Sequence, residues 1–345
     1  MIEGLRDRRI TLVGGAGFIG HHLALSLRAA GANVTIVDSL QVNNLGEFSA
    51  SLPDFHNREL YLRIINERLD LLRAAGVPIV TQDARDYHAL TRILTELKPQ
   101  TIVHLAAVSH AGKSNKDPYS TFDHSLRTLE NALDAARGHV EHFVFLSSSM
   151  AYGNFRSDTV TEDHPLDPIG IYGALKVAGE KMVIAYQQVF GLSYTIVRPS
   201  ALYGPRCVSR RVGQVFIESA IDGSPLRIDG GGDERVDFTY IDDLVQGISL
   251  AITHPAARNE VFNLTYGAAR SIKDLAGIIR THFPEVELQY VERDRLVPFR
   301  GTLSVEKARE LIGYEPAFPI ERGFPIYIEW YRKLLGTSSA AALAR

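Results

Sequence analysis

Short runs of β-branched and aromatic residues alternate with longer amphipathic stretches along the first 200 residues of the chain. The apolar runs predict buried strands at 9–13, 34–37, 79–81, 101–105, 142–147 and 194–197. The stretches between them have helical spacing at 17–30, 86–97, 121–137 and 172–190, and several end at a glycine. Strands and helices that alternate over this length predict an α/β Rossmann fold, a doubly wound parallel sheet.

Beyond Ser200 the alternation breaks down into loops rich in glycine and arginine, at 203–213 and 229–235, with helices expected near 215–221, 272–282, 305–311 and 321–334. Residues 261–264 read as one more strand that returns to the main sheet. We therefore expect a cofactor-binding domain of residues 1–200 plus about 238–266, and a smaller discontinuous C-terminal substrate lobe of about 201–237 and 267–335. Residues 336–345 read as a frayed tail.

One stretch, 42–76, is longer than the usual connection between a strand and the next. Its residues 57–75 have helical periodicity, so the sequence predicts an inserted helix before the third strand. Such a helix serves either as a local cover or as an oligomer contact.

Composition excludes several classes of protein. With 45% apolar and 22% charged residues among 345, the chain has ordinary globular usage. A net charge of −3 gives no electrostatic support for binding nucleic acid or a membrane surface, so we expect small-molecule partners. The lone Cys207 excludes an internal disulfide and a cysteine-based metal cluster, and we expect no metal. Because no long apolar segment or signal peptide is evident, we expect a cytoplasmic protein.

A glycine-rich turn directly follows the first strand and opens a helix. The run from Gly14 through Ala16 to Gly17, Phe18, Ile19 and Gly20 allows a tight turn and lets backbone N–H groups approach a diphosphate. Asp38, 18 residues after Gly20, ends the second strand, where a carboxylate accepts from ribose hydroxyls and repels a 2′-phosphate. This spacing predicts an NAD site.

Two later strands end in residues that fit the same site. Asp83 follows the third strand and can meet the adenine amino group, although an aspartate in this context is more often a helix N-cap. The fourth strand ends in His104 and then Leu105, Ala106 and Ala107, whose small side chains leave room for a cofactor. His104 itself reads as a buried histidine rather than a ligand.

Tyr172 and Lys176 stand four apart at the start of a helical stretch, so their side chains share one face. Ser148 lies at the end of the fifth strand, at the edge where cofactor binding is expected. An adjacent ammonium favours the phenolate form of a tyrosine, so Tyr172 can take a proton from a substrate hydroxyl while Ser148 binds the same oxygen. Lys176 can also hold the cofactor ribose. The alternative is an exposed helical pair beside a serine-rich strand end.

These motifs resemble the extended short-chain dehydrogenase/reductases, and within them the NAD-dependent nucleotide-sugar epimerases and dehydratases. The resemblance spans nearly the whole chain and includes Gly14 to Gly20, Asp38, His104 to Ala107, Ser147 to Gly153, Tyr172 to Lys176, Arg198 and Pro199, Tyr203 to Arg206, Asp237 to Asp243 and Arg300 to Leu303. It implies cofactor contacts by Ala84 and Pro199 besides those named above, and substrate contacts by Ser109 and Ser149. It also implies a homodimer through the helices near 121–137 and 172–190.

The resemblance also bears on the reaction. The two places after Ser148 carry Asp and Glu in the 4,6-dehydratases, whereas this chain has Ser149 and Met150, and neither can serve as an acid at neutral pH. It therefore implies a 4-epimerase that oxidises C4 transiently and returns the hydride to the other face. The alternatives are a dehydratase, decarboxylase or net oxidoreductase of the same family, and a non-enzymatic NAD sensor or scaffold.

On the substrate side, the resemblance implies that arginines bind a nucleotide diphosphate, most often that of a UDP-sugar. The arginines at the corresponding places are Arg206, Arg210, Arg211, Arg235 and Arg300, of which we expect Arg206, Arg211, Arg235 and Arg300 to contact the substrate. Their number exceeds what two phosphates need, which leaves a hexuronate such as UDP-glucuronate open beside a hexose. The chain departs from the family pattern at His124 and Ala201, where asparagines are common, and Arg235 is one residue out of step.

Overall fold

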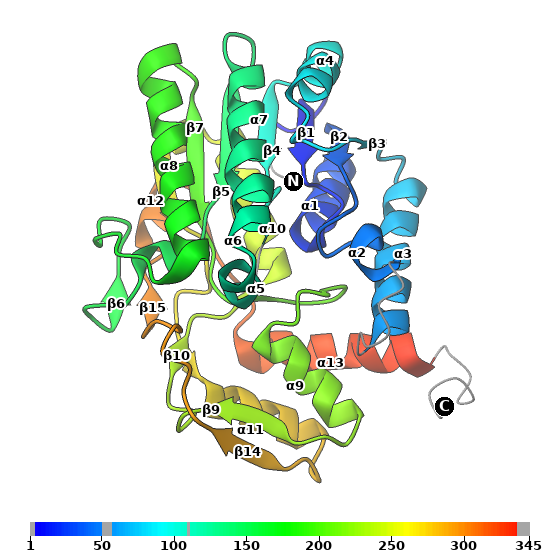
Figure 1. Cartoon of the computed structure of the whole chain (residues 1–345), viewed down its shortest axis with the longest axis vertical. Coiled ribbons are helices and arrows are strands. Elements are labelled where there is room, and N and C mark those ends of the chain that lie inside the picture. Colours follow the sequence, from blue (N-terminus) through cyan, green and yellow to red (C-terminus); the bar gives the residue numbers. More distant parts are fainter. Residues whose placement is uncertain (1–3, 50–56, 109–110, 337–345) are drawn as a thin grey trace.

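The computed structural model describes residues 4–49, 57–108 and 111–336, and its centre is a parallel sheet of seven strands (Figure 1). The strand order is β12-β7-β5-β4-β1-β2-β3. The strands are β1 (Arg9–Val13), β2 (Asn33–Asp38), β3 (Ile79–Thr81), β4 (Thr101–His104), β5 (His142–Leu146), β7 (Tyr194–Arg198) and β12 (Glu260–Asn263). This arrangement confirms the predicted α/β doubly wound fold.

Helices cover both faces of the sheet because neighbouring strand residues point to opposite sides. Leu12 and Ile36 belong to one hydrophobic cluster and the adjacent Val13 and Val37 to another. The first cluster includes α1 (Phe18–Ala29) and α10 (Ile241–Thr253), and the second includes α4 (Tyr87–Leu97), α7 (Thr128–Ala136) and α8 (Gly170–Phe190). The sheet is therefore buried on both sides, as its almost continuous apolar strands require.

The helix predicted at 121–137 has a different course in the structure. It begins earlier with α6 (Pro118–Phe122), because Asp117 caps it by accepting from the Ser120 N–H at 3.0 Å and Pro118 occupies its first turn. A π turn (Asp123–Arg127) then leads into α7. The short α5 (Ala111–Lys116) precedes α6.

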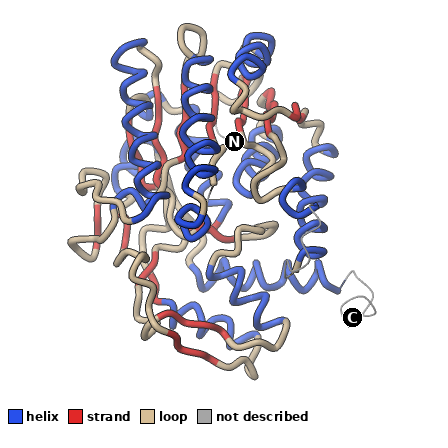
Figure 2. The backbone as a smooth tube through the Cα atoms, viewed as in Figure 1, coloured by secondary structure: helices blue, strands red, loops and turns tan. Residues whose placement is uncertain are grey.

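The inserted stretch after β2 forms α2 (Leu45–Ser49) and α3 (Arg58–Ala74). The predicted inserted helix is thus present. It packs against α1, and Figure 2 shows it as a separate helical column at the edge of the sheet.

The elements after residue 200 lie mainly below the carboxyl edge of the sheet (Figure 1). They include α9 (Val212–Ile221), the parallel pair β9 (Leu226–Asp229) and β14 (Leu288–Val291), the antiparallel pair β10 (Arg235–Val236) and β13 (Arg270–Ser271), α11 (Ile272–His282) and α13 (Ile320–Gly336). The remaining elements are the parallel pairs β6 (Thr159–Val160) with β15 (Thr302–Leu303) and β8 (Leu202–Tyr203) with β11 (Thr239–Tyr240), the helix α12 (Glu306–Ile312) and 3₁₀ turns at Ser149–Tyr152 and Pro255–Ala257. Gly336 is the last residue of α13, so the prediction that the frayed tail begins at this residue is wrong. Residues 337–345 lie outside the described residues.

Candidate active site

Two cavities adjoin at the carboxyl edge of the sheet, where the chain passes from strand to helix. Ile19, Leu105, Ala107 and Arg211 line both of them. The first cavity follows the glycine turn, and the second opens between β5, α8 and the elements after residue 200. Such an edge is where parallel α/β sheets bind ligands.

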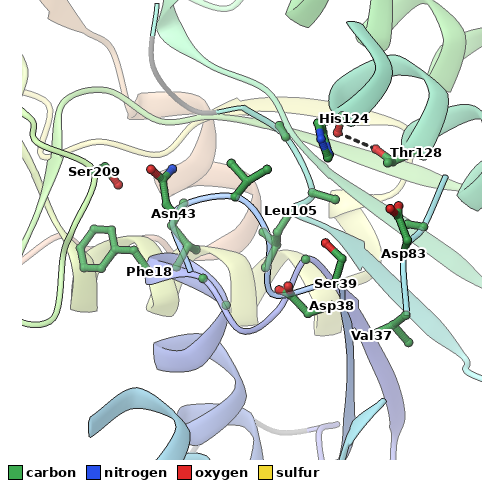
Figure 3. Close-up of a pocket in the computed structure, with 18 of the residues that line it drawn as sticks. Phe18, Val37, Asp38, Ser39, Asn43, Asp83, Leu105, His124, Thr128 and Ser209 are labelled. Carbon is green, nitrogen blue, oxygen red and sulfur yellow. Dashed lines mark hydrogen bonds between the residues drawn. The ribbon is translucent and has the colours of Figure 1, made fainter. Parts of the chain in front are cut away.

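The first cavity contains most of the residues predicted to bind the cofactor (Figure 3). They are Gly14, Gly17, Phe18, Ile19, Gly20, Asp38, Asp83, Ala84, Leu105, Ala106 and Ala107. In Figure 3, Asp38 and Ser39 come from the end of β2, Asp83 from the end of β3, and His124 and Thr128 from the helix after β4. The structure thus brings residues from four strand ends together.

The glycine turn has no space for a side chain at Gly14 or Gly20. Gly14 has a positive φ of 79°, and a Cβ there would lie 2.5 Å from the Ala106 backbone nitrogen. A Cβ on Gly20 would overlap the Gly15 carbonyl oxygen, so α1 packs directly on the turn. This close backbone approach fits a dinucleotide whose diphosphate meets the N-terminus of α1.

The Asp38 carboxylate is fixed by backbone donors. One oxygen accepts from the Ala16 N–H at 2.9 Å and the other from the Leu40 N–H at 2.7 Å. Burial raises the pKa of Asp38, and these two bonds together with the charge of Arg68 oppose that rise. The carboxylate therefore has a set orientation at the cavity wall, as a ribose-binding group requires.

Asp83 is held by Arg85 rather than by a helix end. The Arg85 Nη2 donates to it at 2.6 Å, and Arg85 also contacts Asp123 at 3.1 Å. Burial acts to raise the pKa of Asp83, but the hydrogen bonds from Arg85 outweigh it and keep the pKa below its usual value. The N-cap of α4 is Asp86, which accepts from the Ala89 N–H at 3.0 Å, so the N-cap alternative for Asp83 is wrong.

The second cavity gathers the predicted chemical group. The predicted residues that line it are Ser148, Ser149, Tyr172, Lys176, Pro199, Arg211 and Arg300. Ser148 begins the 3₁₀ turn after β5, where its hydroxyl accepts from the Met150 N–H at 3.2 Å. Tyr172 and Lys176 lie one helical turn apart in α8, with the Lys176 Nζ 5.8 Å from the centre of the tyrosine ring.

Lys176 is anchored from the strand. Its Nζ donates to the Leu146 carbonyl oxygen at 2.7 Å and lies 5.1 Å from the centre of the Phe145 ring. Burial lowers the pKa of Lys176 to about 8, although the Glu180 carboxylate raises it. The side chain thus has a fixed position beneath the cavity and an unusually acidic ammonium.

The charge that supports ionisation of Tyr172 comes from Arg211. The sequence predicted that it would come from Lys176. Burial raises the pKa of Tyr172, and the effects that oppose this rise are the charge of Arg211 and a hydrogen bond with Ser148. Arg211 belongs to the loop before α9, far from α8 in the sequence. This long-range neighbour has no signature in the spacing of Tyr172 and Lys176.

A buried ion pair supports the turn that carries Ser148. The Arg198 guanidinium donates to both oxygens of Glu180, at 2.9 and 2.6 Å, and the hydroxyl of Ser147 donates to the same carboxylate. Both charged side chains are almost completely buried. Because each partner neutralises and hydrogen-bonds the other, the end of β5 and the middle of α8 are held together.

Two of the predicted substrate arginines do not reach either cavity. The Arg206 guanidinium contacts Glu67 at 3.1 Å and donates to the His21 Nε2 at 3.0 Å, so it points toward α1 and α3. Arg235 lies in β10 and its Nη2 donates to the Ala269 carbonyl oxygen at 2.9 Å. Both have protein partners elsewhere, which the loop sequence did not reveal. Ser109 lies outside the described residues.

The inserted stretch supplies residues of the first cavity. Asn43 and Arg68 line it, whereas the sequence predicted only a local cover or an oligomer contact there. A signal was present, because Arg68 interrupts the apolar stripe of Ile64, Ile65 and Leu72 that α3 buries. A charged residue on a buried helical face requires a polar neighbour there.

Comparisons with known proteins agree with this geometry. Residues 10–265 match the sequence model of the NAD dependent epimerase/dehydratase family. The chain is 29% identical over 336 residues to an uncharacterized UDP-glucose epimerase of Bacillus subtilis, covering 94% of this chain and 98% of that protein. It is 27% identical over 355 residues to UDP-glucuronate 4-epimerase 1 of Arabidopsis thaliana, covering 97% of this chain and 79% of that one. Among solved structures, the UDP-glucose 4-epimerase of Thermotoga maritima with UDP-glucose superimposes with a TM-score of 0.80, at 27% identity over 94% of this chain and 99% of that chain.

Proposed function

Since the chain belongs to the NAD dependent epimerase/dehydratase family, we propose that it is a nucleotide-sugar 4-epimerase acting on a UDP-hexose or a UDP-hexuronate such as UDP-glucuronate. The observation that carries this proposal is the composition of the second cavity. Ser148, Tyr172 and Lys176 line it together, while the two places that are acidic in 4,6-dehydratases are Ser149 and Met150. The carboxylates of this cavity, Asp229, Glu234 and Asp294, come from the elements after residue 200.

NAD is the cofactor of the family, and the residues of the first cavity fit it. When bound, NAD would supply the hydride acceptor and donor for C4 of the sugar. Tyr172 takes the proton of the C4 hydroxyl and later restores it, with Ser148 donating a hydrogen bond to the same oxygen. Lys176 holds the ribose next to the nicotinamide, and the apolar wall of the second cavity excludes water from the keto sugar.

Arg211 and Arg300 support an anionic substrate. The Arg211 Nε is buried and has no hydrogen-bond partner within the described part of the chain, at the junction of the two cavities. Burial lowers the pKa of Arg300, which Glu234 opposes, and Arg300 lines the same cavity. Two arginines there can bind a diphosphate, and Arg211, which lines the same cavity as Tyr172 and whose charge opposes the rise in the pKa of that tyrosine, can serve a carboxylate on the reacting sugar.

Product analysis without added NAD tests the proposal. Purified protein is incubated with UDP-glucose and with UDP-glucuronate, and the products are separated by chromatography. A 4-epimerase gives an isomer of equal mass and no lasting NADH absorbance. Loss of water, loss of carbon dioxide or accumulating NADH would instead assign a dehydratase, a decarboxylase or a net oxidoreductase, and an unchanged substrate with bound NAD would favour a sensor or scaffold.

Three further expectations belong to this proposal, and they concern the bounds of the substrate lobe, the cellular compartment and the oligomeric state. The substrate lobe consists of about residues 201–237 and 267–335. The reaction takes place in the cytoplasm, where the lone thiol of Cys207 stays reduced. No helix of residues 4–49, 57–108 and 111–336 is long and apolar enough to cross a membrane.

The last expectation is a homodimer. The exposed apolar side chains of Tyr119 and Phe122 on α6 and of Val189 and Phe190 on α8 support an interface on these helices. Sedimentation of the purified protein checks it, and a monomer at micromolar concentration would contradict it.

A further inference from the structure

Arg68 is a completely buried arginine on the inserted helix α3. This helix packs against α1, whose N-terminus follows the glycine turn. From there Arg68 reaches the first cavity and lines it together with Asp38, Asn43 and the residues of the turn. The insertion thus contributes a charged side chain to the wall of the cofactor site.

The guanidinium of Arg68 is positioned by carbonyl groups. Its Nε and Nη2 donate to the Arg206 carbonyl oxygen at 2.9 and 2.5 Å, and its Nη1 lies 3.5 Å from the Asn43 carbonyl oxygen. In the described residues no carboxylate oxygen lies within ion-pair distance of it. A buried guanidinium without an ion pair costs several kcal/mol of folding free energy. Such a cost is expected where a ligand supplies the missing negative charge.

The neighbouring groups that the structure describes give Arg68 no direct ion pair. Arg206 has its own partner in Glu67, at 3.1 Å. His21 and His22 are neutral at physiological pH, because burial lowers the pKa of both, that of His22 to about 3. Asp38 is a negative group of the same cavity wall whose charge opposes the lowering of the Arg68 pKa by burial, but its two oxygens are bonded to backbone N–H groups and not to the guanidinium. Among the described residues, Arg68 therefore has no carboxylate in direct contact, although the charge of Asp38 acts on it from within the same cavity wall.

We propose that Arg68 is the counter-charge for the diphosphate of the bound dinucleotide. The N-terminus of α1 offers only partial charges, equivalent to about half an elementary charge. A diphosphate carries two negative charges, so a full positive charge on the cavity wall completes the site. This assigns a cofactor-binding role to the inserted helix, and it rests on the proposed function only in requiring that the protein binds NAD.

Calorimetric titration with three probes tests the inference. Nucleotide-free protein is titrated with NAD, with ADP, which keeps the diphosphate, and with adenosine, which lacks it. Replacing Arg68 by Met should weaken NAD and ADP by about 10- to 100-fold, the cost of losing a charged hydrogen bond, and leave adenosine unchanged. The matched control is Arg73→Met on the same helix, an exposed residue paired with Asp70, which should bind all three probes like the wild type.

Arg68→Lys separates charge from shape. It keeps the positive charge and should bind ADP within about 10-fold of the wild type. Three outcomes would each overturn the inference. They are equal losses of ADP affinity in the Lys and Met variants, an adenosine affinity that falls as far as that of ADP, and an NAD affinity that is unchanged in a destabilised Arg68→Met variant. A wild type that binds no NAD would reject the proposed function itself, so the two failures are distinct.

Discussion

Tyr172 occupies an environment that opposes its own ionisation. Burial raises its pKa, and only Arg211 and Ser148 oppose that effect among its neighbours. A phenol of this kind binds its proton firmly until a substrate and the cationic nicotinamide arrive.

The sequence identified the Ser148, Tyr172 and Lys176 group because adjacency in a helix and position at a strand end are local properties. It missed Arg211 as the electrostatic neighbour and the protein partners of Arg206 and Arg235, because the direction of a loop side chain depends on distant groups such as Glu67 and Ala269.

Replacing Tyr172 by Phe should reduce epimerisation by about 10²- to 10⁴-fold, because the proton of the C4 hydroxyl then has no acceptor. Lys176→Ala should lose turnover to a similar degree, since the ribose of the cofactor loses the ammonium group that holds it. Steady-state kinetics with the identified UDP-sugar measure the loss. NAD binding by Tyr172→Phe serves as the control and should be retained, and normal turnover in this variant would remove the mechanism.

At the scale of elements, the sequence predicted the strands of the sheet and the main helices within one to three residues, because each has a regular apolar period. It did not predict α10, although Leu244, Ile248 and Ile252 stand four apart, since Asp242 and Asp243 interrupt the apolar pattern in its first turn. It also missed β9 and β14, whose pairing joins residues 62 apart from Leu226 to Leu288. The two middle residues of β14 are both exposed and its two end residues are half-buried. The strand therefore lacks the alternation of buried and exposed positions from which strands are predicted. The π turn before α7 has no sequence signature that we can name.

Gly20→Ala should damage the contact between α1 and the glycine turn. The added methyl group would overlap the Gly15 carbonyl oxygen, and backbone cannot move aside as a side chain can. We expect a loss of about 1–3 kcal/mol in the free energy of unfolding, together with weaker NAD binding. The control is Gly277→Ala in the exposed middle of α11, where nothing lies within 4 Å of the new Cβ, and it should stabilise the protein by about 0.5–1 kcal/mol. Equal stability of both variants in chemical denaturation would contradict this account.

At the scale of the whole molecule, Asp237 joins its own segment to two others that are remote in sequence, at 265–267 and at Leu303. It accepts from the Thr265 hydroxyl at 3.0 Å, from the Gly267 N–H at 3.2 Å and from the Leu303 N–H at 3.1 Å. It is completely buried, and burial raises its pKa to about 7 despite these bonds. The resemblance drew attention to this stretch, but its part in joining the segments required the tertiary structure.

The raised pKa of Asp237 makes stability depend on pH. Between about pH 4 and pH 7 the folded state binds more protons at this residue than the unfolded state, so its contribution to stability is full below pH 4 and is lost as the pH rises through 7. Asp237→Asn removes this titration. Urea denaturation gives the free energy of unfolding of both proteins, and the compared quantity is the wild-type value minus the variant value. We expect this difference to be on the order of 2 kcal/mol larger at pH 5 than at pH 7. Parallel stability curves would show that Asp237 titrates like an exposed carboxylate.

The position of β12 has a consequence for how a newly made chain folds. Its residues 260–263 pair with β7, which is buried along its whole length, and form one border of the sheet. A ribosome therefore completes six strands long before the seventh emerges, and during that interval the apolar border of β7 offers unpaired N–H and C=O groups to other nascent chains. Slow translation between codons 200 and 260 would lengthen that interval and favour aggregation over native assembly.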